Sequence, residues 1–161
     1  MDEREFMEEA LKLAREAAAE GEVPVGCVIV RKDRIVGRGR NRRETEKNAL
    51  CHAEIEAIND ACRNLGGWRL WDCTLYVTLE PCPMCAGAIL SARIPKVVYG
   101  ASDRKFGAVR SVCALFDMAF NHHPQVESGV MEAEAAALMT EFFQNLRLTL
   151  RTRPKWRPPE Q

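Results

Sequence analysis

A strand pattern passes into a helix start within one short stretch, Thr74-Leu75-Tyr76-Val77-Thr78-Leu79-Glu80-Pro81-Cys82-Pro83-Met84-Cys85. β-branched and aromatic residues fill its first half, which predicts a strand that Pro81 ends. Pro83 suits the first turn of a helix, where its missing N–H is not needed. Cys82 and Cys85 lie three positions apart, so they share one helix face, and a helix N-terminus favours thiolates. The stretch predicts a strand, a turn and a helix that begins with half of a metal site.

On both sides of this stretch, apolar residues alternate between the helical and the strand period. The expected helices cover residues 3–20, 52–65, 83–92 and 132–148, with a helical turn near 114–120. The expected strands cover residues 25–31, 34–40, 74–79, 96–100 and 125–130, and the first two are joined by a tight turn at Lys32-Asp33. Alternating strands and helices predict an α/β fold whose sheet has parallel pairs and helices on both faces. The opening hairpin makes that sheet mixed.

The bulk composition indicates one globular domain. The chain has 161 residues, of which 47% are hydrophobic and 29% charged, a usual balance for such a domain. No run of 18 apolar residues is present, so we expect no membrane-spanning helix. The N-terminus is acidic and amphipathic, unlike a secretory signal, so we expect a cytoplasmic protein. We assign residues 1–150 to the domain and residues 151–161 to a basic, proline-rich tail.

Charge is distributed unevenly although the formal net charge is zero. Residues 1–22 hold eight acids against three bases, residues 31–43 hold seven bases against one acid, and residues 144–161 hold five bases against one acid. Local basic stretches of this kind occur on phosphate-binding faces. They occur equally often as solvated surface, so charge alone leaves both interpretations open.

A second motif, His52-Ala53-Glu54, supplies the remaining parts of a catalytic metal site. With Cys82 and Cys85, His52 makes three protein ligands and leaves the fourth zinc position open for water, as in catalytic sites. Residues two apart on a regular helix point about 200° apart, so His52 and Glu54 serve one site only if His52 lies at the very start of its helix. Zinc lowers the pKa of bound water to about 7, and Glu54 would pass the water's proton to a departing amine. The motif predicts hydrolytic removal of ammonia from an amidine-like carbon.

Other cysteines and histidines offer alternatives to this site. Seven cysteines in a chain without a secretion signal indicate metal ligands or buried thiols before disulfides. Cys51 directly precedes His52 and would close the site as a structural fourth ligand, which would leave Glu54 without a use. We expect core positions for Cys27, Cys62 and Cys73. His122 and His123 would either bind a second metal or pack a loop.

The combination of His-x-Glu with Pro-Cys-x-x-Cys is the signature of zinc nucleobase deaminases. Beyond it, the chain resembles the bacterial tRNA-specific adenosine deaminases, of the cytidine and deoxycytidylate deaminase zinc-binding superfamily, over about residues 4–148. The matching runs are Glu22-Val23-Pro24-Val25-Gly26, Asn41-Arg42, Thr74 to Cys82, Met84-Cys85-Ala86-Gly87-Ala88, Arg93-Ile94, Val97-Val98-Tyr99-Gly100-Ala101, Asp103, Lys105, Gly107 and Phe142-Phe143.

The resemblance implies a three-layer α/β/α cytidine-deaminase-like fold with a central sheet of about five strands, one Zn²⁺ per chain and a homodimer. The implied reaction converts the wobble adenosine of a tRNA anticodon stem-loop to inosine. The implied zinc ligands are His52, Cys82 and Cys85, with Glu54 as the catalytic proton carrier. The implied substrate residues are Asn41, which would hydrogen-bond the flipped base, Val23, which would line its pocket, and Asp103 and Lys105, which would contact the anticodon loop.

The chain departs from the family pattern at Asn48-Ala49-Leu50-Cys51, where many members have Asp-Pro-Thr-Ala. It departs again at Phe106 and Arg110, where small residues or glycine are common, and at Gln144-Asn145-Leu146, where more arginines are expected. Two other functions therefore stay open. One keeps the chemistry on a free base, nucleoside or nucleotide, such as cytosine, deoxycytidylate or guanine. The other is a zinc-stabilised RNA-binding module without catalysis.

Overall fold

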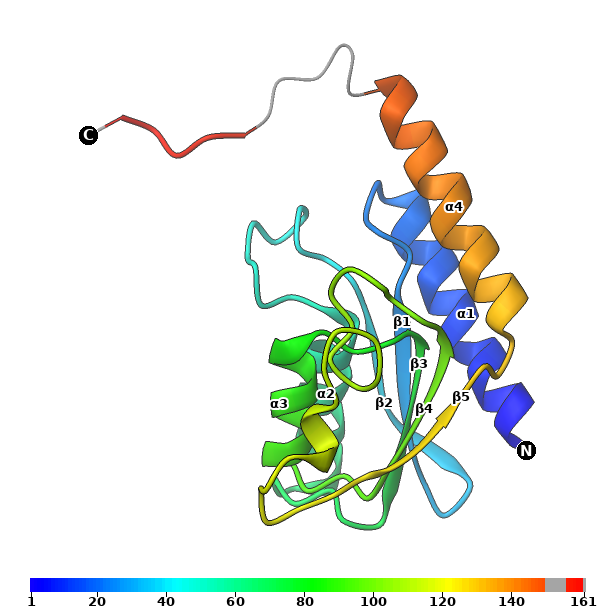
Figure 1. Ribbon diagram of the computed structural model, residues 1–161, viewed down its shortest axis with the longest axis vertical. Coiled ribbons are helices and arrows are strands. Elements are labelled where there is room, and N and C mark those ends of the chain that lie inside the picture. The colour runs from blue at the N-terminus through cyan, green and yellow to red at the C-terminus, as the bar shows by residue number, and fades with distance from the viewer. Residues whose placement is uncertain (150–155, 161) are drawn as a thin grey trace.

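A five-stranded mixed sheet lies between two layers of helices (Figure 1). The computed structural model describes residues 1–149 and 156–160. Its helices are α1 (Glu3–Ala19), α2 (Ala53–Leu65), α3 (Pro83–Ser91) and α4 (Glu132–Thr149), with a 3-10 turn, η1 (Leu115–Asp117). Its strands are β1 (Gly26–Arg31), β2 (Arg34–Arg40), β3 (Cys73–Leu79), β4 (Lys96–Ala101) and β5 (Gln125–Ser128).

The strands are ordered β2-β1-β3-β4-β5 in the sheet. β1 pairs antiparallel with both β2 and β3, whereas β3, β4 and β5 run parallel. The β1–β2 hairpin turns at Lys32 and Asp33, which both adopt a positive φ, as the tightest hairpin turns require. The expected mixed α/β sheet with helices on both faces is confirmed.

Each face of the sheet is sealed by its own apolar cluster because neighbouring strand residues point to opposite faces. Cys27 and Ile29 pack toward α2 and α3, whereas Val28 and Val30 pack toward α1. Figure 1 shows α1 and α4 together on one face and α2 and α3 on the other. The layers therefore agree with the three-layer arrangement that the resemblance implied.

Small residues bring α2 unusually close to the sheet. A Cβ atom on Gly39 of β2 would lie 2.2 Å from the carbonyl oxygen of Ala53 and 2.6 Å from the amide nitrogen of Ala57. Only glycine permits this approach, because any side chain would collide with the α2 backbone. The contact fixes the first turn of α2, where His52 and Glu54 lie.

The expected elements are present, with ends that shift by one to three residues. The predicted helix at 52–65 begins at Ala53, the predicted strand at 125–130 ends at Ser128, and the turn expected near 114–120 shortens to η1. Most of the predicted tail at 151–161 lies outside the described residues. Within residues 1–149 and 156–160, no helix is long and apolar enough to span a bilayer.

Candidate active site

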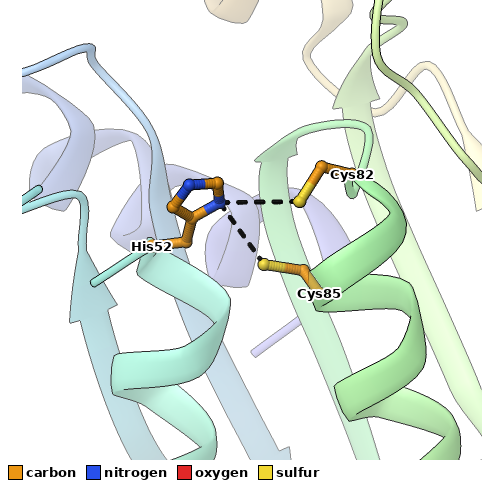
Figure 2. A group of neighbouring side chains, drawn as sticks. All are labelled: His52, Cys82 and Cys85. Carbon is orange, nitrogen blue, oxygen red and sulfur yellow. Dashed lines mark hydrogen bonds between the residues drawn. The ribbon is translucent and has the colours of Figure 1, made fainter. Parts of the chain in front are cut away.

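His52, Cys82 and Cys85 meet where α2 and α3 begin (Figure 2). His52 is the N-cap of α2 and has extended backbone angles, φ −82° and ψ 156°. Cys82 is likewise the extended N-cap of α3, and Cys85 lies in the first turn of that helix. Because His52 precedes the regular helix, it meets the geometric condition that lets His52 and Glu54 face one site.

The separations of the three donor atoms fit a zinc ion. His52 Nδ1 lies 3.6 Å from the Sγ atoms of both Cys82 and Cys85. Tetrahedral bonds of about 2.3 Å to sulfur and 2.0–2.1 Å to nitrogen place such atoms about 3.6 Å apart. Nitrogen and sulfur donors are also the set that zinc prefers. Among the described residues, the group contains these three side chains and no fourth.

Ionisation of Cys82 suits metal binding. A hydrogen bond from the Cys85 thiol, assisted by one from His52, lowers the pKa of Cys82 to about 4. The same bond to Cys82 raises the pKa of Cys85 well above its ordinary value, and burial adds to that rise. Cys82 is therefore a thiolate at neutral pH, the form in which cysteine binds metals.

Glu54 lies in the first turn of α2 and is only 4% exposed. Burial raises its pKa to about 7, because an apolar environment disfavours the charged carboxylate. A carboxyl group with that pKa can both accept and release a proton near neutrality. Glu54 is not one of the three side chains of the donor group, as expected of a residue that carries protons and does not bind the metal.

One pocket collects all but one of the site residues that the sequence singled out; Cys85 lies outside its lining. His52, Glu54 and Cys82 line it, and so do all four predicted substrate residues, Val23, Asn41, Asp103 and Lys105. Asn41 is 7% exposed; its amide donates to the Val23 carbonyl oxygen, and its side-chain oxygen accepts from the Arg43 N–H. Helix α4 contributes Met139, Phe142, Phe143 and Leu146 to the lining. The pocket thus joins the donor group to surfaces from distant parts of the chain.

Relatives with known names match nearly the whole domain. A family model described as MafB19-like deaminase matches residues 1–147. The tRNA-specific adenosine deaminase of Streptococcus pyogenes serotype M1 is 52% identical over 139 residues, which are 86% of this chain and 81% of that protein. The tRNA-specific adenosine deaminase of Bacillus subtilis (strain 168) is 48% identical over 143 residues, which are 88% of this chain and 89% of that protein. This chain belongs to the tRNA-specific adenosine deaminase family.

Structural comparison leads to the same family. A solved structure from studies of A-to-I editing by tRNA:A34 deaminases at the wobble position of transfer RNA has a TM-score of 0.81 against this chain. It is 47% identical in sequence and covers 83% of this chain and 98% of its own. The expected cytidine-deaminase-like fold is confirmed, and the chain is an enzyme of the deaminase class.

Two buried carboxylates beside the deaminase pocket were not assigned roles from the sequence. Glu22 is 1% exposed and accepts the backbone N–H groups of Glu44 and Thr45 at 3.0 and 2.7 Å. Glu80 is 2% exposed and accepts hydrogen bonds from the loop that follows β4. The available signal was weak: Glu80 is an acid at the end of an apolar strand, where a carboxylate without partners would be costly to bury.

Most of the alternative metal ligands have other partners. His122 Nε2 and His123 Nδ1 donate to the carbonyl oxygens of Ile94 and Phe116, each at 2.7 Å. Cys51 lies outside the donor group, and burial together with a hydrogen bond to Glu56 raises its pKa. Cys27 and Cys73 are buried in the core, as expected, whereas Cys62 is only partly buried.

The basic stretch at residues 31–43 does not form one positive face. Its residues follow the β1–β2 hairpin, so the two ends of the stretch are separated along the strands. Arg31 pairs with Asp72 at 2.7 Å, Arg40 with Glu20 at 2.7 Å, and Arg42 with Glu46 at 2.5 Å. From this stretch only Arg43 is a cation of the pocket lining, where Arg104 and Lys105 accompany it.

Proposed function

We propose that this protein is a zinc-dependent deaminase that converts the wobble adenosine of a tRNA anticodon to inosine. The observation that carries the proposal is one pocket lined by His52, Glu54 and Cys82, in a chain about half identical to tRNA-specific adenosine deaminases. In the net reaction, water is added at C6 of adenine and ammonia leaves, so the amino group is exchanged for a carbonyl oxygen. The chemistry requires a proton carrier and an ordered base.

His52, Cys82 and Cys85 would hold one zinc ion per chain, which when bound makes hydroxide available at neutral pH. Glu54 takes the proton of the attacking water and delivers it to the departing amine. Its burial and its place in the pocket lining support this role, because a carboxylate with a pKa near 7 exchanges protons in both directions.

Asn41 and Val23 would hold the base. The Asn41 side chain is nearly buried and is oriented by its contacts with Val23 and Arg43, so its amide can read a polar edge of adenine. Val23 supplies an apolar wall beside it. A preorganised amide discriminates between bases, since a wrong base would leave it unpaired in a buried site.

An RNA loop suits the pocket better than a free nucleoside does. Arg43, Arg104 and Lys105 lie in the lining together with exposed aromatic side chains, and a small neutral substrate would not use them. Bases of an anticodon loop are unstacked, so one can enter the pocket at little cost. Asp103 and Lys105 would meet the loop around the reacting nucleotide.

An inosine assay tests the proposal. The substrates are an anticodon stem-loop with adenosine at the wobble position, the same stem-loop with its adenosine moved to another loop position, and free adenosine, cytidine and guanine. Inosine at the wobble position alone is the expected result. Product from a free base or nucleoside alone would replace the RNA substrate by a small one, and RNA binding without any product would favour a non-catalytic module.

A homodimer and a cytoplasmic location remain predictions. Met118 and Phe120 follow η1 and are 50% and 48% exposed, and Trp68 is 52% exposed. Phe120 and Trp68 line a second pocket together with Leu90 of α3. A second copy of the chain would cover this apolar surface. Light scattering of the purified protein, with Phe120→Ser as the variant expected to weaken the dimer, tests this prediction.

A further inference from the structure

An irregular loop, residues 102–111, forms part of the pocket. It follows β4 and contributes Ser102, Asp103, Arg104, Lys105 and Phe106 to the lining. Phe106 is 62% exposed although it is large and apolar. An exposed aromatic beside two cations is the combination with which proteins bind unpaired nucleotides, by stacking on a base and pairing with phosphates.

The loop is attached to the core through one carboxylate. Glu80 Oε1 accepts the Asp103 N–H at 3.1 Å and the Ser111 hydroxyl at 2.5 Å. Glu80 Oε2 accepts the N–H groups of Val109, Arg110 and Ser111 at 3.2, 2.9 and 3.0 Å. Five donors from one loop thus converge on a side chain that is 2% exposed. A carboxylate has about four lone-pair sites, so its accepting capacity is fully used.

The turn that carries Phe106 is built directly on this carboxylate. A Cβ atom on Gly107 would lie 2.3 Å from Glu80 Cδ, so the loop backbone packs against the carboxyl group itself. Asp103 Oδ1 accepts the N–H groups of Lys105 and Phe106 at 3.1 and 3.2 Å. The backbone on both sides of Phe106 is therefore fixed, and its ring is presented at the pocket.

We propose that Glu80 is a positioning residue for RNA binding, which holds the 102–111 loop so that Phe106 stacks on an unpaired base next to the reacting adenosine. The inference rests on the proposed function for its substrate. Glu80 acts through the loop, since its own oxygens are occupied by loop donors.

Kinetics of Glu80→Gln, Phe106→Ala and the double variant on the wobble stem-loop test the inference. Glutamine replaces one acceptor oxygen by an amide that faces N–H donors, so the loop leaves its binding conformation for part of the time. We expect KM to rise about tenfold in each single variant, with kcat within about twofold, because affinity falls with the competent fraction. The KM of the double variant should equal the higher of the two single-variant values. Once the loop is released, Phe106 no longer stacks on the base, so its removal has little further effect. If the two increases in KM multiplied in the double variant, or if the variants lowered kcat alone, the inference would be overturned.

Amide hydrogen exchange tests the loop without any substrate. Glu80→Gln should speed exchange at Asp103, Val109 and Ser111, and leave unchanged the amides of Glu44 and Thr45, which Glu22 holds. Arg110 also donates to Val126 O and Ser128 Oγ at 3.2 and 2.9 Å, so the loop stays attached and the variant should fold. Unchanged exchange in the loop would overturn the positioning role even if the wild type failed to make inosine.

Two further variants separate the loop from its neighbour, the metal site. Ser111→Ala removes one donor far along the chain from Cys82, and we expect a smaller KM rise with full zinc content. Glu5→Gln, at an exposed position of α1, is the control and should match the wild type. If Glu80→Gln lost zinc while Ser111→Ala left KM unchanged, the carboxylate would act through the metal site and the inference would fail.

Abasic stem-loops identify the stacked base. Removing the base on the 5′ or the 3′ side of the adenosine should raise the wild-type KM at one of these positions. At that position Phe106→Ala should have no further effect, because its partner is already gone. An unaltered Phe106→Ala effect on both abasic substrates would exclude stacking, whereas an inactive wild type would reject the proposed function instead.

Discussion

At the scale of single residues, the burial and the position of Glu54 support its proposed role in proton transfer. It is 4% exposed, lies two positions after His52 and borders the pocket. The Glu54 carboxylate interacts with Cys85 of the donor group, whereas Glu22 and Glu80 each hold a loop. The contrast separates an acid available for proton transfer from two acids used to shape the pocket.

Glu54→Gln should lower kcat by about 10²–10⁴, the usual contribution of general acid–base catalysis, with full zinc retention. Glutamine keeps the shape of the side chain but cannot carry the proton. Inosine formation and zinc content of the same preparation provide the measurement. Loss of zinc in step with activity would instead place Glu54 among the groups that maintain the metal site.

Cys85→Ser should abolish stoichiometric zinc binding and lower the melting temperature. A ligand present at a hundred times its dissociation constant stabilises by about 2.7 kcal/mol, which corresponds to roughly 5–10 °C for a chain of this size. Metal analysis and thermal unfolding check both effects. Cys113→Ser is the matched control, because Cys113 is exposed and lies outside the donor group; zinc retention in Cys85→Ser would contradict the assignment.

At the scale of elements, the site depends on how α2 and α3 begin. Both helices place a proposed zinc ligand at the N-cap, in extended backbone. Neither cap side chain makes the usual hydrogen bond to its own helix. The cap side chains are therefore available to bind the proposed zinc ion. Because they do not stabilise their helices, packing against the rest of the fold must hold the two helix starts in place.

Gly39→Ala tests that packing. The new methyl group would lie 2.2 Å from the Ala53 carbonyl oxygen, so α2 must shift at the turn that carries His52 and Glu54. We expect a stability loss of about 1–3 kcal/mol and a larger relative loss of kcat/KM. Urea unfolding and inosine kinetics measure the two effects. Gly67→Ala, whose new methyl group would have no neighbouring atom within 4 Å, should change neither; equal behaviour of both variants would refute the packing argument.

At the scale of the whole molecule, acids and bases are mixed locally, both along the β1–β2 hairpin and around the pocket. Ion pairs take up Arg31, Arg40 and Arg42. Arg43, which lies 3.9 Å from Glu44, lines the pocket together with Arg104, Lys105 and several acids. Electrostatic attraction of RNA to this pocket should therefore be modest.

The salt dependence of RNA binding should reflect these three cations. Each phosphate contact to single-stranded nucleic acid contributes roughly 0.7 to the slope of log Kd against log salt, so we expect a slope of about 2 for the stem-loop. Lys105→Gln should lower the slope by about 0.7. A slope near zero, or an unchanged slope in the variant, would remove these residues from the phosphate contacts.

The sequence by itself determined the order of helices and strands, the start of α3 at Cys82-Pro83 and the residue types of the metal site. Those features follow from local periodicity and from ligand chemistry at short spacing, which neighbouring residues encode. Only the tertiary structure decided that Val23, Asn41 and Lys105 share a pocket, that Glu80 holds the 102–111 loop, and that Arg31, Arg40 and Arg42 of the basic stretch pair with acids. These outcomes depend on sheet order and on contacts between residues far apart in the chain, whose partners no local pattern names.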